Sequence, residues 1–343
     1  MSPTKSTKIF PITTFISDLP ANLFPQSLPS PNNGPVSGRL VIVGDVHGMR
    51  KSLEALLDKI DFDKINGDHL ILVGDLVNKG PDSPGVVDLA IKLGASAVRG
   101  NHENAVLNAA AEINATRSSL LHSNDSTGNP AISENLETDL PGDTGRDVGI
   151  PDKCVPATVT SIGMGHSTAT YSTALSLSAA QIDWLAALPL ILRAKLPRAF
   201  TPTFGDTLIV AHAGLAPSIS LEDQDPHAIM HMRSLVRSPG DDDGVIPAEA
   251  PGDESWVTEW DRWQDRLASK TTVVFGHDAK RRLQRSRYAI GLDSACLYGH
   301  QLSALVIAAS DGNIEHRVVQ VECADMPVAP VLSVEQGDKK ATL

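Results

Sequence analysis

Apolar residues along the chain gather in short runs, and each run is followed by a longer segment of mixed polarity. Three of the runs have the length and apolar content of buried strands: residues 39–43, 69–73 and 96–98. The segments after them place apolar side chains at helical spacing and predict helices over residues 52–60, 83–93 and 104–121. Buried strands that alternate with helices predict an α/β fold.

This alternation stops after residue 121. Residues 122–149 contain 15 Ser, Thr, Asn, Gly or Pro among 28 positions. So long a loop inside a domain is typical of a functional insertion or of disorder, and we place the whole insertion at about residues 122–170. Beyond it, the pattern predicts a helix at 178–188, strands at 207–210 and 271–275, and strands joined by turns from 288 to 322. Asp311 and Gly312 are a hairpin signal within that last segment.

Composition separates one folded domain from two ends. Residues 1–37 are rich in Pro, Ser and Asn and predict a flexible N-terminal arm, whereas residues 38–323 predict the domain and residues 324–343 a C-terminal tail. Hydrophobic residues make up 41% of the chain, which is enough for a sizeable core. Because no run of about 18 apolar residues is present, the sequence predicts no membrane span.

Charge and cysteine content narrow the class of protein further. The chain has 29 Lys and Arg against 41 Asp and Glu, a net charge of −12, which disfavours general binding to nucleic acid or to anionic membranes. The three cysteines Cys154, Cys296 and Cys323 are too few and too scattered for a disulfide framework or a cysteine zinc site. We therefore expect a reducing compartment, the cytoplasm.

Polar loops follow five of the apolar segments, and they carry the candidate chemistry. These loops are residues 44–48, 74–77, 100–103, 211–214 and 276–278, and each contains Asp, Asn or His. In open α/β sheets, ligands bind beyond the carboxyl ends of the strands, so the five loops are expected to converge. Their imidazole, carboxylate and amide groups, without a thiolate, suit Zn, Fe, Mn or similar divalent ions.

The spacing of three of these residues predicts a dinuclear metal site. Asp45 and His47 are two positions apart, so on an extended strand end both side chains point to one side. The carboxylate of Asp75 is able to bridge two ions about 3.5–4 Å apart, the separation used for phosphoryl hydrolysis. Each residue alone would be an ordinary polar side chain in a turn; five such loops in one α/β chain favour the metal site.

The five loops resemble the motifs of the phosphoprotein-phosphatase branch of the calcineurin-like metallophosphoesterases. In order, these motifs are GDxHG, GDxVxRG, GNHE, HxG and GH, and the match extends over about residues 39–320. The resemblance implies a four-layer sandwich, in which two central sheets are flanked by helices and the dinuclear metal site lies at the strand C-terminal ends. It also implies two divalent metal ions, of which Mn, Zn, Fe, Co and Mg are the candidates.

The resemblance also implies roles for individual residues of this chain. It places Asp45, His47 and Asp75 on one ion. It places Asp75, Asn101, His212 and His277 on the other. It makes His102 the general acid that protonates the leaving group.

Two positions depart from the protein-phosphatase motif and change the expected substrate. Asn78 and Lys79 stand where protein phosphatases have Asp and Arg. Residues 74–83 instead resemble the ApaH-like phosphatases, as do 277–280, 291–299, 302–305 and the predicted helix that contains Trp256, Trp260 and Trp263. This second resemblance implies phosphoanhydride substrates: inorganic polyphosphate, dinucleoside polyphosphate or capped RNA. His300 occupies the second glycine of the bacterial pattern.

The departure at Asn78 is consistent with that substrate class on physical grounds. An Asp beside His102 would raise the pKa of the imidazole, and Asn78 cannot do so. A leaving phosphate, with a pKa near 6, needs a strong acid less than a serine alkoxide does. Lys79 in place of Arg still binds phosphate, as a point charge without the bidentate fork.

Further residues are expected around the metals. We expect Lys79, Asn101 and Arg233 to bind phosphate, and Asn78 and Asp278 to support the residues in contact with substrate or metal. Five basic residues close to His277 predict either a docking patch for a polyanion or a solvated surface: Lys280, Arg281, Arg282, Arg285 and Arg287.

Two other functions are compatible with the same motifs. One is a serine/threonine protein phosphatase of the same fold. The other is a catalytically dead scaffold that binds partners through the insertion at residues 122–170. A vacuolar location is the alternative to the cytoplasm, because the resemblance includes membrane-anchored vacuolar polyphosphatases.

Overall fold

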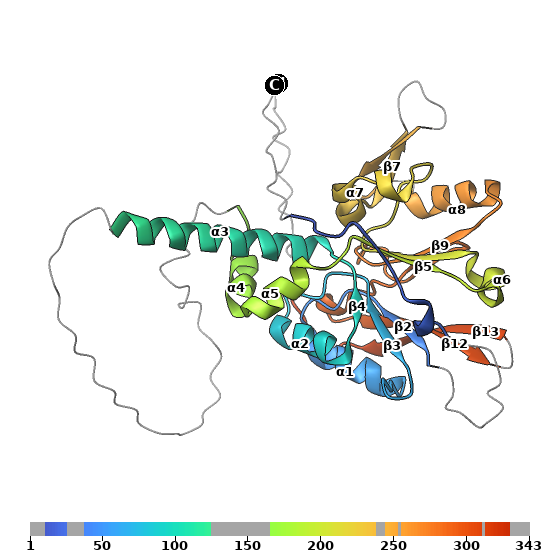
Figure 1. Ribbon diagram of the computed structural model, residues 1–343, viewed down its shortest axis with the longest axis horizontal. Coiled ribbons are helices and arrows are strands. Elements are labelled where there is room, and N and C mark those ends of the chain that lie inside the picture. The colour runs from blue at the N-terminus through green and yellow to red at the C-terminus, as the bar shows by residue number, and fades with distance from the viewer. Residues whose placement is uncertain are drawn as a thin grey trace, which may run out of the picture.

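A computed structural model describes residues 11–25, 38–124, 165–237, 244–252, 255–310 and 313–329. Two mixed β-sheets stack at the centre, and helices cover the outer face of each, with α1 and α2 on one side and α7 and α8 on the other (Figure 1). The four-layer α/β sandwich that the sequence predicts is therefore confirmed. None of the described helices is long and apolar enough to cross a membrane.

The first sheet has five strands in the order β13-β12-β2-β3-β4. Their bounds are Leu40–Val43 for β2, His69–Leu72 for β3, Ser96–Ala97 for β4, Gln301–Ser310 for β12 and Asn313–Glu322 for β13. Strands β2, β3 and β4 are parallel and are connected by α1 (Arg50–Lys59) and α2 (Ser83–Leu93). The register pairs Ser310 with Asn313, so the hairpin predicted at residues 311–312 has its two strands as expected.

The second sheet has six strands in the order β1-β5-β6-β9-β11-β10. Their bounds are Ile16–Asp18 for β1, Ile191–Lys195 for β5, Thr207–Ala211 for β6, Thr271–Phe275 for β9, Gln284–Arg285 for β10 and Ala289–Gly291 for β11. Strand β1 lies within the range predicted as a flexible arm, and it pairs in parallel with β5 at the sheet edge. This part of residues 1–37 therefore belongs to the domain.

The remaining elements surround the two sheets. The other helices are α3 (Asn101–Asn124), α4 (Thr168–Ser176), α5 (Ala179–Ala186) and α8 (Trp256–Arg266), with the shorter α6 (Thr201–Phe204) and α7 (Pro226–His231). Strands β7 (Ser234–Arg237) and β8 (Val245–Ala248) form a separate antiparallel pair. Short 3-10 turns occur at Ala21–Leu23, Arg198–Phe200, Leu221–Asp223 and Cys296–Tyr298. Of the predicted insertion, residues 125–164 lie outside the described residues.

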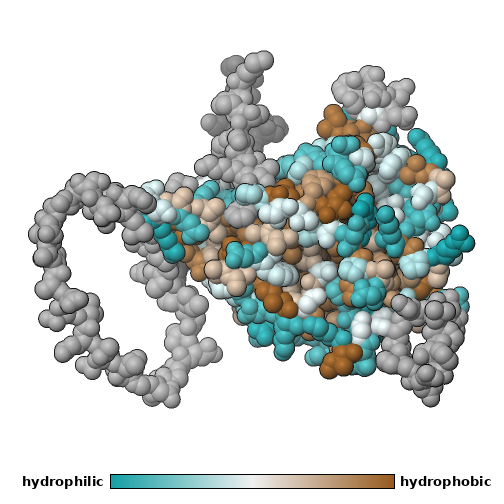
Figure 2. All heavy atoms as spheres, in the orientation of Figure 1, coloured by the Kyte–Doolittle hydropathy of each residue, from teal (hydrophilic) through white to brown (hydrophobic). Residues whose placement is uncertain are grey.

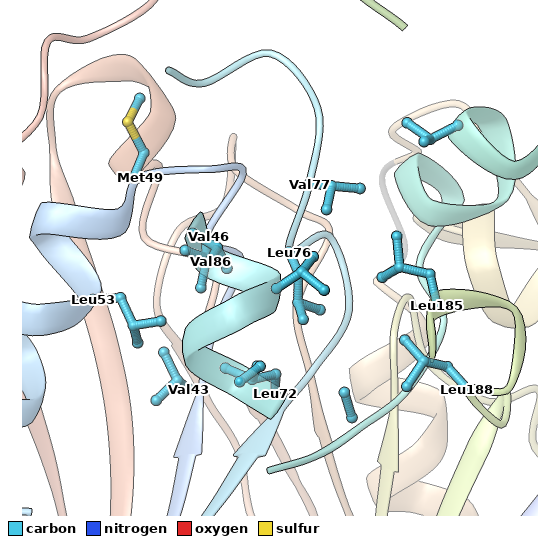
Figure 3. Close-up of a cluster of buried hydrophobic side chains, with 14 of the residues drawn as sticks. Val43, Val46, Met49, Leu53, Leu72, Leu76, Val77, Val86, Leu185 and Leu188 are labelled. Carbon is cyan, nitrogen blue, oxygen red and sulfur yellow. The ribbon is translucent and has the colours of Figure 1, made fainter. Parts of the chain in front are cut away.

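The layers form because each central strand is apolar on both faces. In β2, Leu40 and Ile42 pack between the two sheets, whereas Val41 and Val43 pack against α1 and α2. Figure 3 shows the cluster between this sheet and its helices, in which Val43, Leu53 and Leu72 come together. Each fully buried aliphatic side chain of this kind contributes about 1.5–3 kcal/mol to folding. On the face shown in Figure 2, hydrophilic residues surround smaller apolar patches.

Helix α2 fixes the loop before it, which becomes part of the site. The side chain of Asp82 accepts a hydrogen bond from the backbone N–H of Gly85 at 2.8 Å and so caps the first turn. Pro84 occupies the first turn, where no N–H donor is needed. Gly94 ends the helix at φ 67°. These local signals hold residues 78–82 between the ends of β3 and α2.

Candidate metal centre

All five predicted loops meet at the carboxyl ends of the parallel strands. Loops after β2, β3 and β4 supply His47, Asp75 and Asn101, and loops after β6 and β9 supply His212 and His277. A cavity of about 930 Å³ opens over this edge, and its walls include His47, Asp75, Asn101, His102 and His277. His212 is fully buried behind it. The convergence expected from the sequence is thus present.

Asp75, His212 and His277 form one compact group with Asn101. The Oδ1 atom of Asn101 lies 3.0 Å from His212 Nε2 and 3.1 Å from His277 Nδ1. The two histidine nitrogens are 3.2 Å apart. Asp75 Oδ1 lies 3.3 Å from His212 Nε2.

The other ring nitrogens decide which of these atoms carry protons. His212 Nδ1 faces the carbonyl of Val73 at 3.0 Å, and His277 Nε2 faces the carbonyl of His231 at 3.1 Å. Because a carbonyl only accepts, both of these nitrogens must donate. In neutral rings, His212 Nε2 and His277 Nδ1 then point lone pairs at the oxygens of Asn101 and Asp75. With the Asn101 oxygen turned to both rings, these four acceptor atoms face one another, an arrangement that a cation between them would stabilise.

The electrostatics of the protein alone agree with this need for positive charge. Burial by itself would lower the pKa of His212, but the nearby Asp75 carboxylate raises it to about 10. The pKa of Asp75 is in turn held well below its ordinary value, against the effect of burial, by His212 and His102. A proton on His212 or a metal ion in the group would supply the same missing charge.

His47, Asp75 and His102 form a second group. Nε2 of His47 lies 3.6 Å from Asp75 Oδ2, and Nε2 of His102 lies 3.8 Å from the same oxygen. Nδ1 of His47 is buried without a hydrogen-bond partner among the described residues. Burial lowers the pKa of His47 to about 3, so its ring is neutral at neutral pH and one of its nitrogens offers a lone pair. Asp75 belongs to both groups, as a bridging ligand must.

Asp45 lies beside these groups but is not one of their members. Both of its carboxylate oxygens accept from the backbone N–H of His277, at 3.1 and 3.0 Å. Gly276 makes room for it, since a Cβ at that position would lie 1.9 Å from Asp45 Oδ1. Burial and the neighbouring Asp293 raise the pKa of Asp45 well above its ordinary value.

Asn78 fixes the orientation of His102. Its Oδ1 accepts from the backbone N–H of Lys79 at 2.9 Å, which leaves its amide nitrogen to face His102 Nδ1 at 2.9 Å and Thr170 Oγ1 at 3.1 Å. Because Asn78 donates to Nδ1, the neutral ring of His102 carries its proton on Nε2. Burial lowers the pKa of His102 to about 4, against the opposing effect of Asp75.

Glu103 is a buried residue of this site to which the sequence assigned no role. Its buried carboxylate accepts from four backbone N–H groups. Oε2 bonds Asp75 N and Gly100 N, both at 2.8 Å, and Oε1 bonds Leu76 N at 2.7 Å and Val77 N at 3.2 Å. It therefore holds the Asp75 loop against the start of α3. Its position in the GNHE motif was the feature of the sequence that could have identified it.

Asp293 is a second residue without an assigned role. It is buried and lines the cavity, and its Oδ1 accepts from Ala295 N at 2.9 Å. Burial raises its pKa to about 6, and the negative charge of Asp75 acts in the same direction. It adds a carboxylate to the region that already holds Asp45 and Asp75. A group of three buried carboxylates strengthens the argument for cations there.

The expected phosphate-binding residues lie on the same cavity. Lys79, Asn101 and Arg233 all line it. Asp278 supports this wall through Arg281. Its carboxylate binds the guanidinium of Arg281 at 2.5 Å, and Arg281 also donates to the carbonyl of Arg233 at 3.1 Å. Nitrogen and oxygen donors without sulfur fit a divalent metal of the type that the sequence predicts.

Known proteins share both the sequence motifs and the fold of this chain. The sequence model of the calcineurin-like phosphoesterase family matches residues 38–303. The chain is 28% identical over 297 residues to a zinc-dependent endopolyphosphatase of Saccharomyces cerevisiae, which covers 83% of this chain and 81% of that protein. It is 44% identical over 63 residues to a symmetrical bis(5'-nucleosyl)-tetraphosphatase of Cellvibrio japonicus, which covers 18% of this chain and 23% of that protein.

One solved structure extends the similarity over almost the whole fold. It is a crystal structure named as a candidate diadenosine tetraphosphatase, with a TM-score of 0.57 and 29% sequence identity. The superposition covers 90% of this chain and 98% of that chain. Since the family match spans most of the chain and the site holds the donors that its motifs require, the chain belongs to the calcineurin-like phosphoesterase family.

Proposed function

We propose that this chain is a metal-dependent hydrolase of phosphoanhydride bonds in inorganic polyphosphate, dinucleoside polyphosphate or capped RNA. The observation that carries the proposal is the set of facing acceptor atoms on Asp75, Asn101, His212 and His277. The similarity to an endopolyphosphatase and to a bis(5'-nucleosyl)-tetraphosphatase supports the phosphoanhydride class.

The metal ligands would be those that the sequence predicts. Asp45, His47 and Asp75 would hold one divalent ion. Asp75, Asn101, His212 and His277 would hold the other. When bound, such ions lower the pKa of a water molecule and neutralise charge on a phosphoryl group. Mn, Zn, Fe, Co and Mg remain candidates, and the zinc dependence named for the yeast relative makes zinc the first to test.

The side chains of the cavity would handle the substrate itself. Lys79, Asn101 and Arg233 would bind the phosphoryl oxygens and stabilise the charge that develops on them. His102 would present its Nε2–H to the leaving oxygen. A leaving phosphate requires only this hydrogen bond, whereas a serine alkoxide requires a complete proton. The contact between Asn78 and His102 Nδ1 therefore favours anhydrides as substrates.

The two alternative functions have less support. A protein phosphatase of the same fold has support from a 43% identity over 75 residues to a Salmonella typhimurium serine/threonine-protein phosphatase 1, covering 22% of this chain. The donor on Asn78 argues against it. A dead scaffold is disfavoured by the full set of donors around Asp75. The cytoplasmic location, and the vacuole as its alternative, stay predictions.

A substrate panel tests the proposal. Purified protein, loaded in turn with each candidate metal, is assayed with tripolyphosphate, long-chain polyphosphate, diadenosine tetraphosphate, capped RNA and a phosphoserine peptide. We expect the highest kcat/KM on a phosphoanhydride, and no turnover above background in the Asp75→Asn control. A preference for the phosphoserine peptide would favour the protein phosphatase, and no turnover of any substrate with any metal would favour the scaffold.

A further inference from the structure

The basic residues that follow His277 differ in the contacts that they make with the rest of the protein. The guanidinium of Arg281 binds the carboxylate of Asp278, and its Nη2 donates to the carbonyl of Gly252 at 3.0 Å. Arg287 pairs with Asp265 at 3.0 Å and lies over the ring of Tyr288. The charge of Arg281 is therefore engaged in contacts within the protein, and that of Arg287 is paired at the surface.

Lys280 and Arg282 have a different setting. Both side chains are exposed, and both line the same cavity as the candidate metal ligands. The cavity has a volume of about 930 Å³, within the size range of sites for drug-sized ligands and larger than one phosphate group needs. Positive charge beyond the metal centre is therefore available to a longer anion.

Arg282 makes a specific contact with His300 on this wall. Its Nη2 lies 2.9 Å from His300 Nε2. A guanidinium only donates, so Nε2 of His300 accepts and the proton of its neutral ring lies on Nδ1. Within the described residues this is the one side-chain hydrogen bond of Arg282, so most N–H groups of its fork can bind a planar or tetrahedral oxyanion. His300 thus orients the guanidinium without neutralising its charge.

Backbone contacts fix the main chain of both partners. Arg282 adopts φ 57°, and its N–H donates to the carbonyl of Asp278 at 3.0 Å. A long side chain rarely occupies this left-handed region, so the surrounding structure must hold it there. The N–H of His300 bonds the carbonyl of Ala295 at 3.2 Å, and its own carbonyl accepts from Cys323 N at 2.8 Å. The contact with His300 then restricts the guanidinium itself, which lowers the entropic cost of binding an anion.

We propose that Arg282, positioned by His300 and assisted by Lys280, binds a phosphate group beyond the bond that is cleaved. This distal phosphate subsite selects oligophosphates over single phosphate groups. Its ligand is the phosphoanhydride chain, which inorganic polyphosphate and nucleoside polyphosphates share. The inference rests on the proposed function, because it concerns the same cavity and the same substrate class.

Steady-state kinetics of the metal-loaded enzyme test the subsite. For Arg282→Gln, we expect the KM for tripolyphosphate and for diadenosine tetraphosphate to rise about tenfold or more, with kcat within about twofold, since a charge-assisted hydrogen bond is lost. The ratio of kcat/KM for tripolyphosphate to that for p-nitrophenyl phosphate should fall by about the same factor. Arg317→Gln, on an exposed position of β13, is the control and should change neither value.

A positioning role for His300 has its own readout. His300→Gly removes the acceptor and should raise the KM for tripolyphosphate by a smaller factor, about threefold, without lowering kcat. His300→Gln keeps an acceptor oxygen and should restore the wild-type KM. Unfolding temperatures of all variants are measured alongside. If the KM for tripolyphosphate rises only in variants with a lowered unfolding temperature, His300 has no positioning role.

Several results would overturn the subsite. An equal rise in KM for p-nitrophenyl phosphate, or an equal effect of Arg285→Gln, would show diffuse electrostatic attraction. An effect on diadenosine tetraphosphate alone would show recognition of the nucleoside. Wild-type turnover of phosphoanhydrides with an unchanged KM in Arg282→Gln would refute the subsite only. A wild-type enzyme that cleaves no phosphoanhydride would refute the proposed function as well.

Discussion

Replacing Asn78 by Asp tests how the protein sets its substrate class. The amide nitrogen of Asn78 donates to His102 Nδ1 at 2.9 Å, and Asp would place a carboxylate oxygen there instead. The backbone tolerates this change, because Asn78 has φ 76° and Asp is among the residues that accept the left-handed region. Lys79→Arg, added to it, rebuilds the protein-phosphatase motif.

The size of the effect follows from this one contact. A hydrogen bond to a charged group contributes about 1.5–3 kcal/mol, and 1.36 kcal/mol corresponds to one pH unit of pKa. The pKa of His102, which burial lowers to about 4, should therefore rise by about one to two pH units in the variant. A raised pKa keeps the imidazolium present to higher pH, so more enzyme holds a protonated acid near pH 6.

The assay compares a substrate that needs the acid with one that needs it less. For the double variant, kcat/KM for a phosphoserine peptide should rise about tenfold relative to tripolyphosphate, the equivalent of about 1.4 kcal/mol. The decline of phosphopeptide activity with rising pH should shift upward by the same one to two pH units. The single variant Lys79→Arg separates the effect of the arginine fork, and Asn78→Ala removes the donor without adding charge.

One result would refute this reasoning. If the ratio of the two kcat/KM values stays the same within error while metal content and unfolding temperature match the wild type, the pair at positions 78 and 79 does not set the substrate class. An equal gain in Asn78→Ala would show that loss of the donor, and not the new charge, changes His102. The preference for anhydrides would then depend on family similarity alone.

Three further predictions concern the centre of the site. Asp75→Asn should abolish activity and reduce metal content from about two ions per chain, measured by elemental analysis, because both predicted ions share this carboxylate. His102→Ala should lower kcat by about 10²–10⁴, and by less for substrates with acidic leaving groups; equal losses on an acidic aryl phosphate and on an alkyl phosphate would exclude a role as acid. Glu103→Gln should lower the free energy of unfolding by about 3 kcal/mol, measured by chemical denaturation. The reason is that the NH₂ group of the new amide would face two of the four backbone N–H donors that the carboxylate now binds. Glu54→Gln, which changes an exposed ion pair on α1, is the matched control.

The parallel core was predictable from the sequence because its strands are buried on both sides. The runs at 39–43 and 69–73 correspond to β2 and β3 within one residue at either end. Their continuous apolar character reflects packing against the second sheet on one face and against helices on the other. The polar loops after them were equally visible, since they interrupt apolar segments with Asp, Asn and His.

The edges of the sheets were not predictable in the same way. Strand β5 reads Ile-Leu-Arg-Ala-Lys. Because Arg193 and Lys195 interrupt its apolar residues, the sequence shows no continuous apolar run at this strand. Strand β1 spans three residues in a Pro-rich region, and it exists because Ile16–Asp18 pairs with β5. Pairing of this kind depends on distant segments, which local composition does not record.

Roles within the site depended on backbone groups that the sequence does not display. Glu103 was visible as a motif member, but its four backbone donors come from two separate loops. Asp278 was expected to support the site, and its partner turned out to be Arg281, three residues along the chain. The sequence identified which residue types gather, whereas the direction of each hydrogen bond required the fold.

Backbone strain connects these observations. Nine described non-glycine residues have positive φ, and six of them line the cavity: His47, Asp75, Lys79, His277, Arg282 and Ala295. Each such residue costs about 1 kcal/mol or more, so the strain is concentrated where the candidate chemistry lies. The buried groups around the site counteract it, since Glu103 binds the N–H of Asp75 and Asp45 binds that of His277. The same carboxylates that lie close to the candidate cations therefore also hold the tight loops that present their ligands, which couples metal binding to the local fold.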